Sequence, residues 1–198
     1  MKNYVIILLV VVSNSLFAQL SPSEIQGKRD EHAAELKDST LGVLNSNEIA
    51  EFQGLDYFEI DTAFQIQATL IKKKGKRFKM PTSTERTPIY RRYGIVVFSV
   101  DDSSYQLEVY QNIDLRKKEG YEDYLFIPFR DGTSRTETYG GGRYLDVKIP
   151  SGKTILLDFN LAYNPYCAYS YRYSCPIPPA INTLSVKIFA GEKTPIRH

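Results

Sequence analysis

The chain has 198 residues, a formal net charge of +2, 42% hydrophobic residues and 24% charged residues. This length and composition are typical of a globular chain with one hydrophobic core. The nearly balanced charge does not indicate a nucleic-acid partner. The only histidines are His32 and His198, so the composition argues against histidine-based catalytic triads and zinc sites.

The first 18 residues have the pattern of a secretory signal peptide. Lys2 precedes an apolar run over residues 5–17, and Ala18 provides a small residue for cleavage before Gln19. A membrane-spanning helix needs about 20 apolar residues, and no later segment approaches that length. We therefore expect an exported protein, periplasmic or secreted, with no transmembrane segment after the signal is removed.

Two short helices are expected after the signal peptide. The first covers residues 22–37 and has Ser23 as a candidate N-cap. The second begins near Asn45, whose spacing to Glu48 is that of a capping box, and it ends at Gly54.

The remainder of the chain has the two-residue alternation that predicts β-strands. A basic run at residues 72–79 follows the first strand and is interpreted as a solvated hairpin tip, since no aromatic ladder accompanies it. Pro128 indicates an edge strand or a bulge. The expected strands cover residues 64–71, 94–100, 105–111, 124–129, 143–149, 153–159 and 184–190.

These elements predict a mainly β protein with short N-terminal helices and an antiparallel, barrel-like or sandwich sheet. The expected organisation is a signal peptide (1–18), an N-terminal helical segment (19–56), a β-rich domain packed with it as one unit (57–192) and a tail (193–198).

The strands at 143–149 and 153–159 are expected to pair as a hairpin. In either register that keeps their apolar residues on one face, Asp146 and Asp158 are opposite or diagonal neighbours on the other. Lys148 and Arg143 are then the local candidates to offset the repulsion, and the alternative is a solvated face where water screens both charges.

A polar loop that contains three consecutive glycines, residues 140–142, precedes the strand at 143–149. Because a strand follows instead of a helix, this is not a phosphate loop; the glycines provide a sharp bend. Polar residues gather here and at the neighbouring strand ends, where binding sites are commonly formed. The candidate ligand-binding residues are Asp131, Thr133, Glu137, Thr138, Tyr139, Arg143, Tyr144, Asp146, Asp158, Asn160, Tyr163 and Asn164.

Several chemistries remain open for this set. A carboxylate acid–base site could use Asp146, Asp158 or Glu137, and a calcium site could use the same residues with Asp131. Neither has a specific ligand spacing, so no metal or cofactor is predicted. A split-barrel cofactor binder is a third possibility, which depends only on the β-rich pattern.

The last loop is rich in tyrosine and contains both cysteines, Cys167 and Cys175. In an exported chain such a pair is expected to form a disulfide. The tyrosines could form an aromatic platform for a sugar or peptide, or pack as a stapled loop on the sheet edge; they are Tyr163, Tyr166, Tyr169, Tyr171 and Tyr173.

The strings "LFIPFRDGTSRTETYGGGRYLDV" and "LDFNLAYNPYCAYSYRYSCPIPPAINTLSVKIFAGE" resemble a bacterial and archaeal domain-of-unknown-function family, number sixteen-eighty-four. The resemblance covers roughly residues 24–192, and Arg135 replaces a glycine that is usual in the family. It implies a shared fold and surface, and it implies no activity. The function we expect is a non-catalytic ligand-binding or structural module for a small molecule or envelope component; the alternative is a carboxylate-dependent hydrolase acting on a cell-envelope or sugar substrate.

Overall fold

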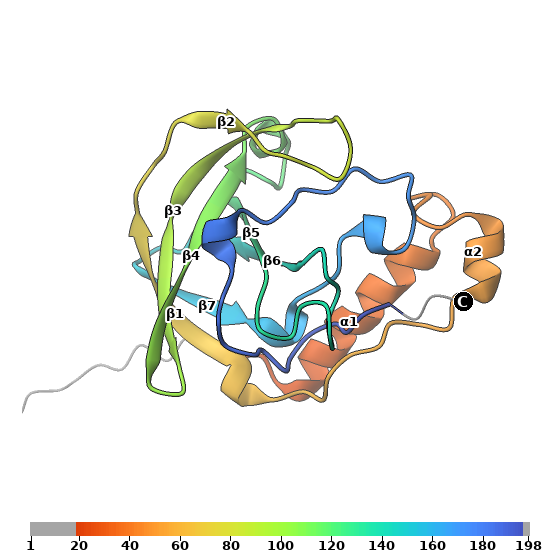
Figure 1. Ribbon diagram of the computed structural model, residues 1–198, viewed down its shortest axis with the longest axis horizontal. Helices are drawn as coiled ribbons and strands as arrows, with labels where there is room; N and C mark the ends of the chain where they lie inside the picture. Colours follow the sequence, from red (N-terminus) through yellow and green to blue (C-terminus); the bar gives the residue numbers. More distant parts are fainter. Residues whose placement is uncertain (1–18, 196–198) are drawn as a thin grey trace, which may run out of the picture.

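The computed structural model describes residues 19–195. The expected signal peptide and the last three residues of the expected tail lie outside this range. Within it the protein is mainly β, with a single antiparallel sheet that curls into a half-barrel and a few short helices (Figure 1). The expected fold class is confirmed.

The sheet has seven strands, β1 (Gln65–Lys72), β2 (Arg77–Lys79), β3 (Ile89–Val100), β4 (Ser103–Asn112), β5 (Tyr124–Phe129), β6 (Arg143–Lys148) and β7 (Thr154–Asp158). Their order is β6-β5-β4-β3-β1-β7, and β2 pairs with β3 alone. The sheet therefore begins and ends with two strands that are consecutive in the sequence.

The hairpin expected between β6 and β7 is wrong. β6 pairs with β5, and β7 pairs with β1, where Asp158 lies opposite Gln65. Because the sheet curls, its two end strands approach without sharing a hydrogen-bonded ladder. Asp146 and Asp158 are therefore not cross-strand neighbours.

The longest hairpin, β3–β4, has a tighter turn than the four-residue gap, 101–104, between the two expected strands. Asp101 and Asp102 alone form it, and both have positive φ, 46° and 60°. Two-residue turns with positive φ match the right-handed twist of the strands.

The expected last strand, residues 184–190, is wrong, because this segment bends at residues 185–186 and lies outside the sheet. It belongs to the C-terminal segment, residues 183–195, which bonds to the loop after β5. The amide of Leu184 donates to Arg130 O and that of Gly132 to Val186 O. The side chain of Asn182 bonds Glu108 and Pro128 O, filling the place where β4 and β5 diverge.

Two α-helices precede the sheet, α1 (Pro22–Lys37) and α2 (Ser46–Glu51). Short 3₁₀ helices cover Thr62–Phe64, Leu115–Lys117, Phe159–Leu161, Tyr166–Ala168 and Ala180–Asn182. The capping box between Asn45 and Glu48 is confirmed. The N-cap of α1 is Ser21 instead of Ser23, because Glu24 then occupies the third helical position and completes a capping box.

Three apolar clusters hold these elements together. The largest fills the inside of the curled sheet, with fully buried residues such as Val96, Leu107 and Leu125. A second is aromatic and extends from Tyr110 to the cysteine-containing loop. The third joins α1 and α2 to that loop, which places α1 beside the open edge between β6 and β7 (Figure 1).

Candidate functional site

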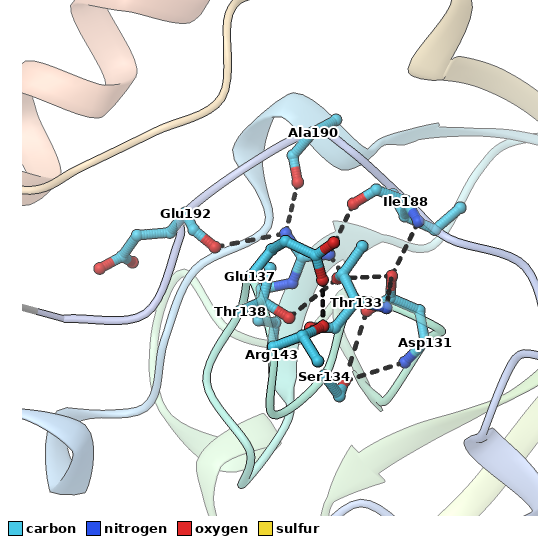
Figure 2. A network of polar contacts seen from close by, with 10 residues as sticks. Asp131, Thr133, Ser134, Glu137, Thr138, Arg143, Ile188, Ala190 and Glu192 are labelled. Carbon is cyan, nitrogen blue, oxygen red and sulfur yellow. Dashed lines mark hydrogen bonds and ion pairs between the residues drawn. The ribbon is translucent and has the colours of Figure 1, made fainter.

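The first of two polar clusters is buried and is shown in Figure 2. Its central contact joins Arg143 NH2 to Asp131 Oδ1 at 3.2 Å, and both side chains are only 1% exposed. Burial lowers the pKa of Arg143, while the neighbouring Asp131 charge raises it. We call this cluster the Arg143 network; its side chains are Asp131, Thr133, Thr138 and Arg143.

The same guanidinium holds the C-terminal segment against the sheet. Arg143 donates to the carbonyl oxygens of Ile188 (3.1 Å), Glu192 (3.3 Å) and Ala190. These contacts satisfy carbonyl groups in a segment that forms no strand of the sheet. Side-chain hydrogen bonds from Arg143 therefore hold the C-terminal segment in place of the backbone hydrogen bonds of a β-ladder.

Asp131 completes the network from the other side. Its Oδ2 accepts hydrogen bonds from the hydroxyl of Thr133 at 2.8 Å and from the amide of Ile188 at 2.8 Å. The Thr133 hydroxyl in turn bonds that of Thr138 at 2.9 Å. With its acceptors used by the protein itself, Asp131 serves to order the loop.

The glycine loop next to this network requires a backbone conformation and close contacts that suit glycine. Gly142 has φ +96°, and a Cβ there would lie 2.6 Å from Phe129 O and 2.7 Å from Pro178 Cγ. A Cβ on Gly141 would lie 2.3 Å from the ring of Tyr139. Only glycine permits this close approach, which lets β6 begin directly beneath the loop.

The second polar cluster lines a cavity of about 980 Å³. This cavity lies at the open edge of the half-barrel, between β6 and β7, and we call it the seam cavity. Its walls come from α1, β5, β6, β7 and the cysteine-containing loop, with Tyr90 of β3. Seven tyrosines line it: Tyr57, Tyr90, Tyr124, Tyr144, Tyr163, Tyr166 and Tyr173. This volume lies at the upper end of the range typical of small-molecule pockets.

Asp146 is the carboxyl group held within this aromatic lining. Tyr124 donates its hydroxyl to Asp146 Oδ1 at 2.7 Å, and Tyr163 donates to Oδ2 at 2.9 Å. The side chain is exposed to the cavity, and the protein atoms that line the cavity partly desolvate it. This desolvation raises the pKa of Asp146 to about 6, against the lowering effect of the two phenol hydrogen bonds.

His32 and Glu192 lie behind Tyr163. The His32 ring packs edge-on against the Tyr163 ring at 5.2 Å, and His32 Nε2 is 3.9 Å from Glu192 Oε2. Burial lowers the pKa of His32 to about 4 and raises that of Glu192 to about 8. Both groups therefore favour their neutral forms and supply no charge to the cavity.

Asp158 lines the seam cavity but has a structural role. It accepts hydrogen bonds from Gln65 Nε2 at 2.8 Å and from the amide and side chain of Asn160 at 3.0 and 2.9 Å. These contacts cap the 3₁₀ helix after β7. Asp158 and Asp146 therefore do not form the pair of neighbouring carboxylates that the sequence predicted.

The structure thus divides the twelve candidate residues. Four line the seam cavity (Tyr144, Asp146, Asp158 and Tyr163), and four form the Arg143 network. The others make local contacts: Glu137 pairs with Lys187 at 3.2 Å, Tyr139 packs on Gly141, Asn160 bonds Asp61, and Asn164 bonds Glu192 and Lys193.

Sequence reasoning missed the contribution of α1 to the cavity. Arg29 is 5% exposed, donates to Asn160 O and Phe58 O, and stacks over the Tyr57 ring at 4.4 Å. The signal was present, because Ile25, Arg29, His32 and Leu36 recur at three- and four-residue spacing and share one face.

Cys175 lines the seam cavity, and Cys167 lies beside it. Their thiols are free, and the Cys167 amide donates to Cys175 Sγ at 3.2 Å. The hydrogen bond from Cys175 is the main cause that lowers the pKa of Cys167 to about 6. The predicted disulfide is thus not present in this structure, although the two cysteines lie close together in space.

Within residues 19–195 there is no group of three or more His, Cys, Asp or Glu side chains that could hold a metal ion. None of the helices in that range is long and apolar enough to cross a membrane.

Comparison with known proteins identifies relatives of unknown function. No curated protein matches the chain. Among solved structures it is similar to the solution NMR structure of an uncharacterized protein of Haloarcula marismortui, at 32% identity and a TM-score of 0.68, covering 89% of this chain and 95% of that one. Residues 50–193 match the family described as "Protein of unknown function (DUF1684)", and the chain therefore belongs to this family.

Proposed function

We propose that this protein is an exported, non-catalytic module that binds a small molecule in the seam cavity, with Asp146 as the group that orients the ligand. The observation that carries the proposal is the Asp146 carboxyl held by Tyr124 and Tyr163 inside an aromatic cavity of about 980 Å³. Pockets with apolar walls and a few fixed polar groups are the usual form of a ligand site.

The Arg143 network supports a ligand site in the seam cavity and not at the glycine loop. Its buried charges are used to fasten the C-terminal segment, so the glycine loop contributes stability instead of ligand contacts. The seam cavity is then the place where polar groups and open volume coincide.

A thermal-shift screen tests this function. The mature chain is melted with amines, sugars, amino acids, nucleotides and carboxylic acids. A ligand that raises the melting temperature must lose its effect in Leu156→Trp, which fills the cavity from β7. Ser99→Trp, at an exposed position of β3, is the matched control and should keep the effect. If no compound acts, or if every effect survives Leu156→Trp, the proposal is wrong.

Export is tested separately. Expression of the full chain in a bacterial host should give a product in the periplasm or medium that begins at Gln19. The two cysteines of that product should be joined, because the oxidising compartment favours the bond and the loop of about nine residues would gain about 2.5 kcal/mol of stability. Mass spectrometry after alkylation without reduction measures the N-terminus and the state of the two thiols. A product of the host cytoplasm that keeps residues 1–18 would contradict export, and two alkylated thiols in the exported product would contradict the disulfide.

A carboxylate-dependent hydrolase acting on a cell-envelope or sugar substrate is the second candidate, because a carboxyl with a pKa of about 6 suits general acid–base catalysis near neutral pH. In that case wild-type protein would turn over an ester or glycoside panel, and Asp146→Asn would remove the turnover without changing the fold. Absence of turnover in wild-type protein would exclude hydrolysis of those substrates.

A further inference from the structure

The charge of Asp146 has no basic partner. Among residues 19–195, no lysine, arginine or histidine nitrogen lies within 4.0 Å of its carboxyl, whose hydrogen bonds come from Tyr124 and Tyr163 alone. The nearest lysine in the sequence, Lys148, is exposed and lies 3.7 Å from Asp123. Two neutral donors orient the carboxylate but leave its negative charge uncompensated.

The tyrosine rings that surround this carboxylate present aromatic carbon more than hydroxyl groups. The hydroxyl of Tyr144 donates to Pro176 O, that of Tyr173 to Gly42 O at 2.9 Å, and Tyr90 is bonded to Asn112. A neutral polyol would therefore find few free hydrogen-bonding groups on these walls. A cation with an apolar body would find both a counter-charge and ring surfaces.

The basic groups of the seam cavity do not fill this role. Arg29 is fixed by two backbone carbonyls and the Tyr57 ring. Lys28 and Arg86 are exposed, as are Glu31 and Glu35, so these exposed wall residues carry both signs. Among the described residues that line the cavity, Asp146 is the carboxyl that two tyrosine hydroxyls hold without a basic partner.

We propose that the seam cavity binds an organic ammonium ion, with its charged nitrogen against Asp146 and its carbon substituents against the tyrosine rings. This inference depends on the proposed binding function and adds to it the chemical class of the ligand.

Isothermal titration at pH 7.5 tests the ligand class with benzyltrimethylammonium and choline. The comparison compounds are 3,3-dimethyl-1-butanol (the neutral isostere of choline), benzoate and glucose. We expect the two cations to bind, and choline to bind at least about tenfold more tightly than its neutral isostere. Asp146→Asn should remove that preference. Glu119→Gln removes the same charge from an exposed residue outside the cavity wall and should preserve it.

Two further measurements separate loss of charge from loss of fold. Tyr163→Phe keeps the carboxylate and removes one phenol donor, so it should retain cation binding with reduced affinity. In wild-type protein, cation affinity should fall as the pH drops from 7.5 to 5, because Asp146 becomes protonated. Burial raises the pKa of the tyrosines around Asp146 and lowers that of His32 to about 4, so these groups keep their charge in this interval; the tyrosines are Tyr90, Tyr124, Tyr163 and Tyr166. Cys167, with a pKa of about 6, and Glu192, with a pKa of about 8, also titrate there. Asp146→Asn keeps both groups, so the part of the pH dependence that this variant loses is the part due to Asp146.

The outcomes distinguish the two proposals. If sugars or carboxylates bind in the seam cavity and cations do not, the ligand class is wrong while the binding function stands. Cation binding that is equal in wild-type protein and folded Asp146→Asn also overturns the ligand class. If no compound of any class binds in a way that Leu156→Trp abolishes, both proposals fail.

Discussion

The Arg143 network and the seam cavity share strand β6 but use polar side chains in opposite ways. Arg143 and Asp146 are three residues apart, and this odd spacing directs them to opposite faces of the strand. On one face the charges are buried, paired and bonded to backbone carbonyls. On the other a carboxylate faces open volume with only phenol donors. Polar residues close in sequence can therefore divide between holding the fold and lining the candidate site.

The largest expected effect comes from breaking the Arg143 network. Arg143→Gln should lower the free energy of unfolding by about 3–5 kcal/mol, because it leaves the Asp131 charge buried without its partner. Urea denaturation measures this loss. Arg135→Gln, an exposed arginine in the same loop, is the control and should change stability by less than about 0.5 kcal/mol. A similar small change for Arg143→Gln would contradict the structural role of the network.

Glu192 connects the two regions, because its backbone accepts from Arg143 while its side chain approaches His32 behind the cavity. Burial raises its pKa to about 8, so the folded state holds a proton that the unfolded state releases near its ordinary pKa of 4.5. The stability from this proton is complete below about pH 4.5 and is lost as the pH rises through about 8.

Glu192→Gln should therefore flatten the pH dependence of unfolding. Wild-type protein should lose about 2 kcal/mol more than the variant between pH 6 and pH 8. The titratable neighbours of Glu192 are present in both proteins, so their contributions cancel in the difference; they are His32, Tyr57 and Arg143. Urea denaturation at several pH values measures it, and parallel pH profiles would show that Glu192 is already ionised.

The sequence predicted what is local and missed what is distant. The helix bounds of α1 and the Asn45 capping box depend on residues within one turn, and both are confirmed. The β6–β7 hairpin was wrong although only five residues separate the two strands, because β6 pairs with β5 and β7 with β1 at opposite ends of the curled sheet. The choice of strand partner depends on the whole sheet and not on spacing along the chain. His32 was missed for the same reason, since only tertiary packing brings α1 to Tyr163.

A smaller effect is expected at Arg135. Its φ is +78°, a conformation that costs a residue with a Cβ about 1–2 kcal/mol. Arg135→Gly should therefore raise the free energy of unfolding by about 1 kcal/mol, after allowance for the greater freedom of glycine in the unfolded chain. Urea denaturation checks this, with Arg135→Ala as the control that removes the side chain and keeps the strain. Equal effects of the two variants would mean that strain is not the cause.

The smallest change in stability is expected at Asp146, which lies on the opposite face of β6 from Arg143. Asp146→Asn loses at least one phenol hydrogen bond, worth about 1 kcal/mol, and also removes a desolvated charge, whose loss acts in the opposite direction. The two effects should leave the free energy of unfolding within about 1 kcal/mol of wild type at pH 7.5, measured by urea denaturation. A loss as large as that of Arg143→Gln would show that Asp146 holds the fold as Arg143 does. A small change would instead mean that the Asp146 carboxylate is not required for folding, as expected of a group that orients a ligand.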